Sequence, residues 1–145
     1  MKYSLANYIL SVEPNDTTIQ SAFGTISIGG EGNHVGEISA EHSTNQWTTE
    51  GYATGAWVHN KSLDRTGTVS LQLNQLTPQI AKLIKMCMTF YDADYDGFTL
   101  SLSTSDGSVV CRAIDCYLTK IPAQVFGNTA ANQTWTWTVG QLIFN

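Results

Sequence analysis

One short stretch, Thr66-Gly67-Thr68-Val69-Ser70-Leu71-Gln72-Leu73-Asn74-Gln75, together with the next three residues, Leu76-Thr77-Pro78, is the best indicator of fold class in this chain. Apolar and polar residues alternate through the first part, with Val69, Leu71 and Leu73 on one face. A period of two predicts a β-strand with one dry face and one wet face. Thr77 and Pro78 suit the N-cap and first position of a helix. We therefore predict a strand that leads directly into a helix.

On either side of this stretch the pattern is mainly β. Alternation and turn residues predict further strands at 4–12, 23–28, 36–44, 98–103, 109–118 and 133–143, with an additional strand at 121–126. The helix after Thr77 is the only one that we predict, because apolar residues recur there at helical spacing. This content favours a two-sheet β-sandwich or barrel with one flanking α-helix. At 145 residues, we expect a single domain over 1–145.

Composition excludes several classes of function. Charged residues make up only 13% and the net charge is −5. An acidic surface repels phosphates, so tight nucleic-acid binding is not expected. The apolar stretches are far shorter than the roughly 20 residues of a membrane span, and the N-terminus does not resemble a signal peptide. We expect the chain to fold in a cytoplasm, with its three cysteines as buried free thiols.

A polar, glycine-punctuated stretch from 45 to 64 contains Trp47, Tyr52 and Trp57. One interpretation is a hairpin whose aromatic side chains fold back on their own core. The other is a protruding arm, at about 45–66, that buries these three residues at a subunit interface. Loops longer than about 12–15 residues are usually functional, which favours the arm. Exposed Trp47 and Trp57 would also suit a carbohydrate-binding or adhesin-like β-sandwich, in which aromatic rings stack on sugars.

Residues for catalysis or a cofactor are not predicted. The sequence has no nucleophile motif or phosphate loop, and His34, His42 and His59 lack metal-ligand spacing. A small hydrolase is therefore disfavoured. The run Asp92-Ala93-Asp94-Tyr95-Asp96-Gly97 matches the opening of a calcium loop, but Ser103 occupies the twelfth position, where a bidentate Glu is required. We favour a solvated acidic turn and retain Asp92, Asp94 and Asp96 as a weak calcium candidate.

Three segments together resemble the tail-tube proteins of contractile-tailed phages and related contractile injection particles. They are Gly55-Ala56-Trp57-Val58-His59, Leu63-Asp64-Arg65-Thr66-Gly67-Thr68-Val69-Ser70-Leu71-Gln72-Leu73, and Leu76-Thr77-Pro78-Gln79-Ile80-Ala81-Lys82-Leu83. The family carries D-R-S-G-T-V-T-V-x-L followed by T-S-P-x-N-A-x-L. Here Thr66 replaces the Ser, Leu76-Thr77-Pro78 replaces T-S-P, and Ile80 replaces the Asn. The resemblance covers roughly residues 4–85, and the C-terminal third agrees only in the order of its elements.

This resemblance implies a structural subunit, not an enzyme. Six copies would form a ring around a lumen, and stacked rings would form a tube through which DNA or an effector passes without specific binding. Partners would be other copies, a sheath protein, and tape-measure and baseplate proteins. There would be no membrane insertion. The location would be a virion tail assembled in the bacterial host cytoplasm.

The wet strand faces are the candidates for the wall of that lumen. Alternate residues of a strand lie on the same face, which places these polar side chains together. Alternatively, Glu37 and Glu41 face bulk solvent outside the particle. The expected lumen-facing residues are Glu37, Ser39, Glu41, Ser43, Ser70, Gln72 and Asn74.

Overall fold

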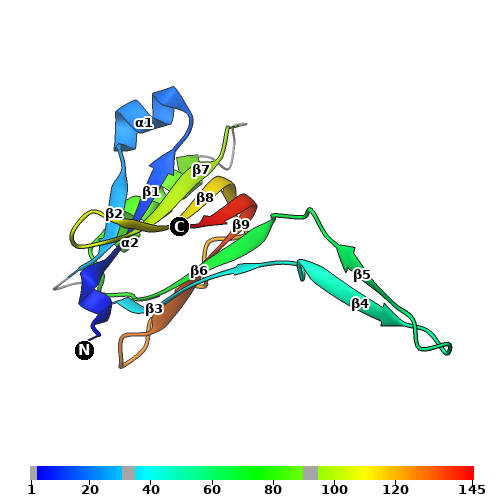
Figure 1. Ribbon diagram of the computed structural model, residues 1–145. Coiled ribbons are helices and arrows are strands. Elements are labelled where there is room, and N and C mark those ends of the chain that lie inside the picture. Colours follow the sequence, from blue (N-terminus) through cyan, green and yellow to red (C-terminus); the bar gives the residue numbers. More distant parts are fainter. Residues whose placement is uncertain (1–2, 31–34, 90–94) are drawn as a thin grey trace.

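The structure is a computed structural model that describes residues 3–30, 35–89 and 95–145 (Figure 1). Its strands form a seven-stranded antiparallel sheet and a separate two-stranded hairpin. The elements, in chain order, are η1 (Leu5–Asn7), β1 (Tyr8–Pro14), α1 (Thr17–Phe23), β2 (Ile26–Gly29), β3 (Val35–His42), β4 (Trp47–Gly51), β5 (Trp57–Lys61), β6 (Gly67–Asn74), α2 (Gln79–Thr89), β7 (Phe98–Thr104), β8 (Val109–Leu118) and β9 (Asn132–Phe144). The prediction of a mainly β fold is confirmed.

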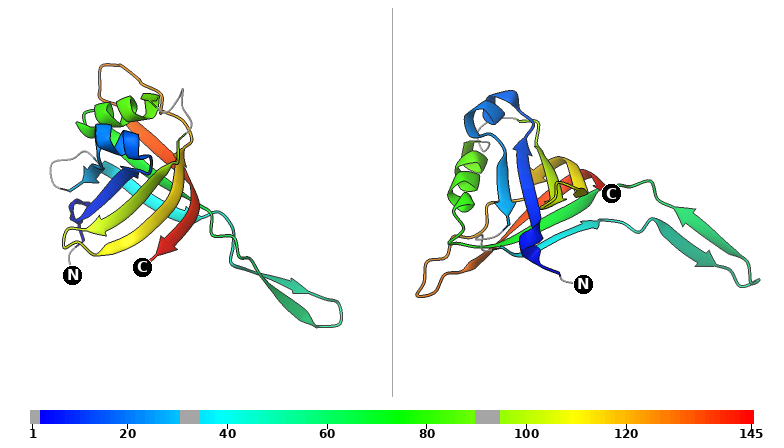
Figure 2. Two further views of the ribbon diagram at one scale, coloured as in Figure 1. Left: turned by 90° about the horizontal axis from the view of Figure 1, so that it is seen from above. Right: turned by 60° about the vertical axis from the view of Figure 1, so that its left-hand side comes forward.

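The large sheet has the strand order β2-β1-β7-β8-β9-β6-β3 and curls around its own apolar face (Figure 2). Shifts in register between β7 and β8, and near the start of β3, mark bulges that increase local twist and help the sheet to bend. The apolar face is thus enclosed by one strongly curved sheet, with β2 and β3 as its two end strands. We call this enclosed unit, with its helices, the body.

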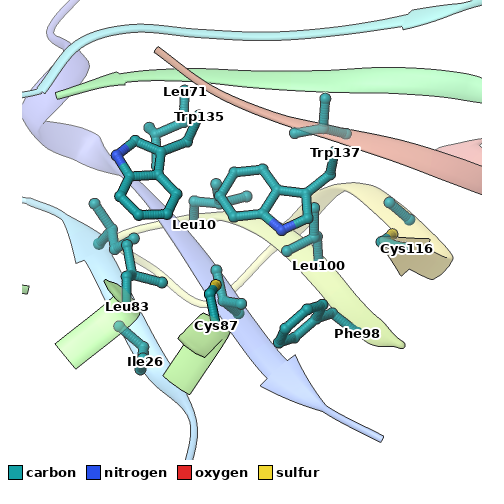
Figure 3. Packing of buried hydrophobic residues seen from close by; sticks show 14 of the residues in the cluster. Leu10, Ile26, Leu71, Leu83, Cys87, Phe98, Leu100, Cys116, Trp135 and Trp137 are labelled. Carbon is teal, nitrogen blue, oxygen red and sulfur yellow. The ribbon is translucent and has the colours of Figure 1, made fainter. Parts of the chain in front are cut away.

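The alternation predicted for the central strand is confirmed. Along β6, buried and half-buried residues alternate without a break, and Leu71 and Leu73 are fully buried. The adjacent β9 places Trp135 and Trp137 on the same inner side, with ring centroids 6.4 Å apart. Figure 3 shows the two indoles between Leu71 and the side chains of the opposite elements, among them Leu83 of α2. The core therefore depends on residues far apart in the sequence.

Helix α2 packs against β2 and α1 and covers one end of the curled sheet. It begins at Gln79, one residue later than predicted, because Pro78 was expected at the first helical position. The prediction that Thr77 is the N-cap is also wrong, because its hydroxyl is buried without a hydrogen-bond partner in the described chain. The Thr77 carbonyl instead accepts from the amide of Ile80 at 3.2 Å. The turn before α2 is therefore held by the backbone.

Two local predictions are corrected. The sequence did not predict α1, which begins after Asp16, whose carboxylate accepts from the amides of Thr18 and Ile19 at 2.9 and 3.3 Å. The strand predicted at 23–28 therefore begins only at Ile26. No strand forms at 121–126, which lies in the loop between β8 and β9. Strands β8 and β9 pair with each other and, on their other sides, with β7 and β6, so neither strand offers this loop an unpaired edge.

The three cysteines are free and buried, as expected from the sequence. Burial raises the pKa of Cys87 and of Cys116 to about 12. It also raises the pKa of Cys111. All three thiols therefore remain protonated at neutral pH and behave as small apolar side chains.

Candidate functional site

The hairpin β4–β5 projects from the body as an arm (Figures 1 and 2). Every residue of both strands is exposed, which no other strand pair of the described chain shows. Trp47, Tyr52 and Trp57 expose 54%, 51% and 67% of their surface. The interpretation in which these rings fold back on the core is therefore wrong. An isolated two-stranded hairpin is marginally stable in water, so this arm lacks the packing that stabilises the other strands.

The pairing register places the two tryptophans on the same face of the arm. Trp47 lies opposite Lys61, Thr49 opposite His59, and Gly51 opposite Trp57. Alternate residues of a strand share a face, so one face, which we call the tryptophan face, consists of Trp47, Thr49, Trp57, His59 and Lys61. The Lys61 ammonium lies 5.6 Å from the centroid of the Trp47 ring. The Thr49 hydroxyl lies 2.8 Å from Nδ1 of His59.

The arm is joined to the body by a hydrogen-bonded base around Asp64. Its carboxylate accepts from the Thr44 hydroxyl at 2.7 Å, and from the Thr66 hydroxyl and amide at 2.7 and 2.9 Å. These bonds, those from Thr66 above all, lower the pKa of Asp64 from 3.8 to about 2. The amide of Ser43 also donates to the Thr66 carbonyl at 3.0 Å. These hydrogen bonds hold the two segments that lead into and out of the arm against each other where they leave the body.

Gly67 permits the close approach of the strands beside this base. A Cβ atom at this position would lie 2.5 Å from the Glu41 carbonyl oxygen and 2.8 Å from the Leu142 side chain. Only glycine fits without a shift of backbone. The glycine of the D-R-T-G-T-V motif therefore has a steric role at the junction of arm and body.

The expected lumen residues gather on the outer face of β3 and β6. The register pairs Glu37 with Gln72, Ser39 with Ser70, and Glu41 with Thr68. Asn74 ends the same face of β6 and donates to the Asn132 side chain at 3.1 Å. Ser43 differs from the others, because it lies beyond the end of β3.

Strand β9 extends this outer face with residues that the sequence analysis did not assign to it. Thr134, Thr136 and Thr138 pair with Gln72, Ser70 and Thr68. We call the whole surface the polar face; it consists of Glu37, Ser39, Glu41, Thr68, Ser70, Gln72, Asn74, Thr134, Thr136 and Thr138. It includes two carboxylates and no cationic side chain. The alternation within β9 was visible in the sequence, but its pairing with β6 was not.

The remaining candidate residues form no site in the described parts of the chain. Asp92 and Asp94 lie outside the described residues, while Asp96 is exposed and its carbonyl accepts from the Asn15 side chain. Within the described ranges, no three His, Cys, Asp or Glu residues gather as a metal site. The ring of His42 packs against Phe144 at 5.5 Å. No helix in the part described is both long and apolar enough to span a membrane.

No protein-family model and no curated protein matches this chain. Solved structures match it over its whole length. A chain of the PVC sheath–tube complex, from an extracellular contractile injection system in the extended state, has a TM-score of 0.62 and 12% identity, with 100% of this chain and 92% of that chain covered. The fold is that of a contractile injection system component. The fold class and the family resemblance predicted from the sequence are thus confirmed at the level of fold.

Two further solved structures are similar to this chain over its whole length. The PVC sheath/tube terminator in the extended state has a TM-score of 0.59 and 14% identity, covering 100% of this chain and 97% of that chain. The tube-terminating cap of the anti-feeding prophage has a TM-score of 0.53 and 12% identity, covering 100% and 93%. All three similarities span the whole of this chain, the arm included.

Proposed function

We propose that this chain is a non-catalytic structural subunit of a contractile injection particle, and that its copies assemble into rings that stack as a tube. The observation that carries the proposal is the arm, whose strands are exposed on both faces. Aromatic side chains bury about 150–250 Å² each, so a neighbouring copy that covers Trp47, Tyr52 and Trp57 would supply the packing that the arm lacks. The shared fold with sheath–tube and terminator chains supports the same role.

In this assembly, six copies form each ring and the polar face lines the lumen. Glu37 and Glu41 then form two negative rings in each layer. Such a wall holds water and has no cationic anchor, so DNA or an acidic effector passes without being retained. A sheath surrounds the tube, tape-measure and baseplate proteins bind at its ends, and the particle acts in a tail-like or extracellular setting.

Negative-stain electron microscopy of the purified protein, with light scattering over a range of concentrations, tests this function. Six-membered rings or long tubes are expected. Monomers at every concentration would contradict the proposal. Monomers that bind glycans would instead support the carbohydrate-binding alternative, which the two exposed tryptophans on one face also suit.

The lumen assignment has a separate test. Glu37→Lys with Glu41→Lys should leave tubes intact but slow the ejection of DNA, most strongly at low salt, where screening is weakest. Glu13→Lys, at an exposed position of β1 away from the polar face, is a control for charge reversal elsewhere on the surface and should have no effect. Normal ejection by the double variant at low salt would show that these carboxylates face outward.

A further inference from the structure

The tryptophan face carries a histidine at its centre. In the pairing register, His59 and Thr49 lie between the pair that contains Trp47 and the pair that contains Trp57. Nδ1 of His59 lies 2.8 Å from the Thr49 hydroxyl. A hydroxyl can donate to a neutral imidazole nitrogen and can accept from a protonated one, so this contact is open to both charge states. The hydrogen bond with Thr49 therefore does not fix the charge of the ring.

The charged group nearest to His59 on this face is a cation. Lys61 lies two residues along β5, on the same side of the strand, and its ammonium is 5.6 Å from the centroid of the Trp47 ring. Glu50, the only carboxylate of the two strands, lies on the opposite face of the arm. No element of the described body packs over either strand, because every residue of both is exposed. Within the described chain, a protonated His59 thus shares its face with a second cation and with no carboxylate.

Burial of this face acts differently on the two charge states of His59. In the proposed assembly a neighbouring copy covers Trp47 and Trp57, and the ring that lies between them is covered with them. Removing a charged group from water is unfavourable unless an opposite charge meets it, whereas a neutral imidazole has only to keep its hydrogen bonds. Thr49 supplies one such bond, and Lys61 repels the charged form. The covered face therefore favours the neutral ring.

We infer that His59 makes assembly through the arm dependent on pH, so that tubes form when the ring is neutral and are weakened when it is protonated. The inference rests on the proposed function, because it takes the tryptophan face as the surface that a neighbouring copy covers. An imidazole in water titrates near pH 6.5, so about one tenth of such side chains are neutral at about pH 5.5. A contact that requires the neutral ring is then weakened about tenfold for each arm.

The net charge of the chain acts in the opposite direction, which makes the effect of His59 recognisable. The chain carries a net charge of −5 at pH 7 and has a pI of about 4.9. Acidification towards about pH 5.5 therefore brings the net charge closer to zero, and this change by itself favours association. Weaker assembly in mild acid thus cannot be explained by the overall charge and requires a specific group that gains a proton at the contact.

Substitutions of His59 with a fixed charge test the inference. The protein concentration needed for tube formation is measured at about pH 8 and about pH 5.5, with electron microscopy to separate tubes from amorphous aggregate. The parent should need about ten times more protein at the lower pH. His59→Gln, neutral at both values, should show no such rise, and His59→Lys should need the higher concentration at both. His42→Gln, where the ring packs against Phe144 in the body, is the control and should respond to pH as the parent does.

Three outcomes would overturn the inference. If the parent shows no rise at the lower pH, or if His59→Gln shows the same rise, His59 is not the responsible group, while the tubes themselves leave the proposed function standing. Tubes that acid favours in the parent but not in His59→Gln would mean that a carboxylate of the neighbouring copy faces the ring. Monomers at both pH values would mean that the proposed function fails, and the inference fails with it.

Discussion

The body and the arm are both made of antiparallel strands, but only the body buries the side chains that its strands carry. In β6, every second residue lies in a dry core, whereas in β4 and β5 every residue is exposed. The body therefore has the packing needed to fold by itself. The arm is held by its cross-strand pairs and by the Asp64 base, and none of its strand residues is buried. We propose that the missing packing is supplied by a contact outside the chain itself.

Thiol reactivity should separate the two regions by the largest factor. Native Cys87, Cys111 and Cys116 should be inert to Ellman's reagent until the body unfolds, because they are buried and protonated. Thr48→Cys in the arm should react at once. With a stability of about 5 kcal/mol or more, the rates should differ at least a thousandfold. Rapid labelling of the unsubstituted native protein would show that the core is open.

Substitutions on the two sides of β6 should separate the inner face from the outer face. Leu71 is fully buried, so Leu71→Asp places a charge in the core and should lower the free energy of unfolding by about 3–5 kcal/mol or prevent folding. Ser70→Asp, one residue away on the polar face, should cost less than about 1 kcal/mol. Urea denaturation followed by circular dichroism measures both. Equal losses would refute the assignment of faces.

Adding one methyl group should distinguish the junction from the arm. Gly67→Ala should destabilise the protein by about 1–3 kcal/mol, because the new Cβ meets the Glu41 carbonyl. Gly51→Ala, in the exposed arm, meets no atom within 4 Å and should change stability by less than about 0.5 kcal/mol. Thermal melts of the two variants measure the difference, and a neutral Gly67→Ala would remove the steric role of this glycine.

The Asp64 base should make the junction between the arm and the body dependent on pH. Since the pKa of Asp64 is lowered from 3.8 to about 2 on folding, its contribution is complete above pH 3.8 and is lost as the pH falls towards 2. The amide resonance of Thr66, which donates to this carboxylate, reports the titration by NMR. We expect a midpoint near 2. A midpoint near 3.8 would mean that the hydrogen bonds from Thr44 and Thr66 do not hold the base in solution.

Regular local patterns were predictable from the sequence. The alternation in β6 and the helical spacing after Pro78 both led to the right elements, because each pattern reflects burial of a single face. Helix α1 escaped prediction because it has seven residues and begins with the β-branched Thr17 and Thr18, which are weak helix formers. The apolar residues at 121–126 suggested a strand, yet they lie in an exposed loop.

The pairing and packing of residues far apart in the sequence could not be predicted in the same way. The polar face requires β9 to pair with β6 across nearly half of the chain, and no local pattern encodes that pairing. The arm aromatics were visible as unusual residues in a polar stretch. Whether they fold back or project depends on the space left in a core already filled by Trp135 and Trp137. The orientation of these rings therefore depends on the packing of the whole body, which the sequence does not show.

The most direct test of assembly through the arm combines Trp47→Ser with Trp57→Ser. Both rings are exposed, so the double variant should keep the circular dichroism spectrum of the parent and an unfolding free energy within about 0.5 kcal/mol per site. Val58→Thr, on the opposite face of the arm, is the control and should assemble normally. At concentrations where the parent forms rings or tubes, negative-stain electron microscopy should show only monomers of the double variant. Normal tubes from a folded double variant would contradict the claim that the arm is the assembly element.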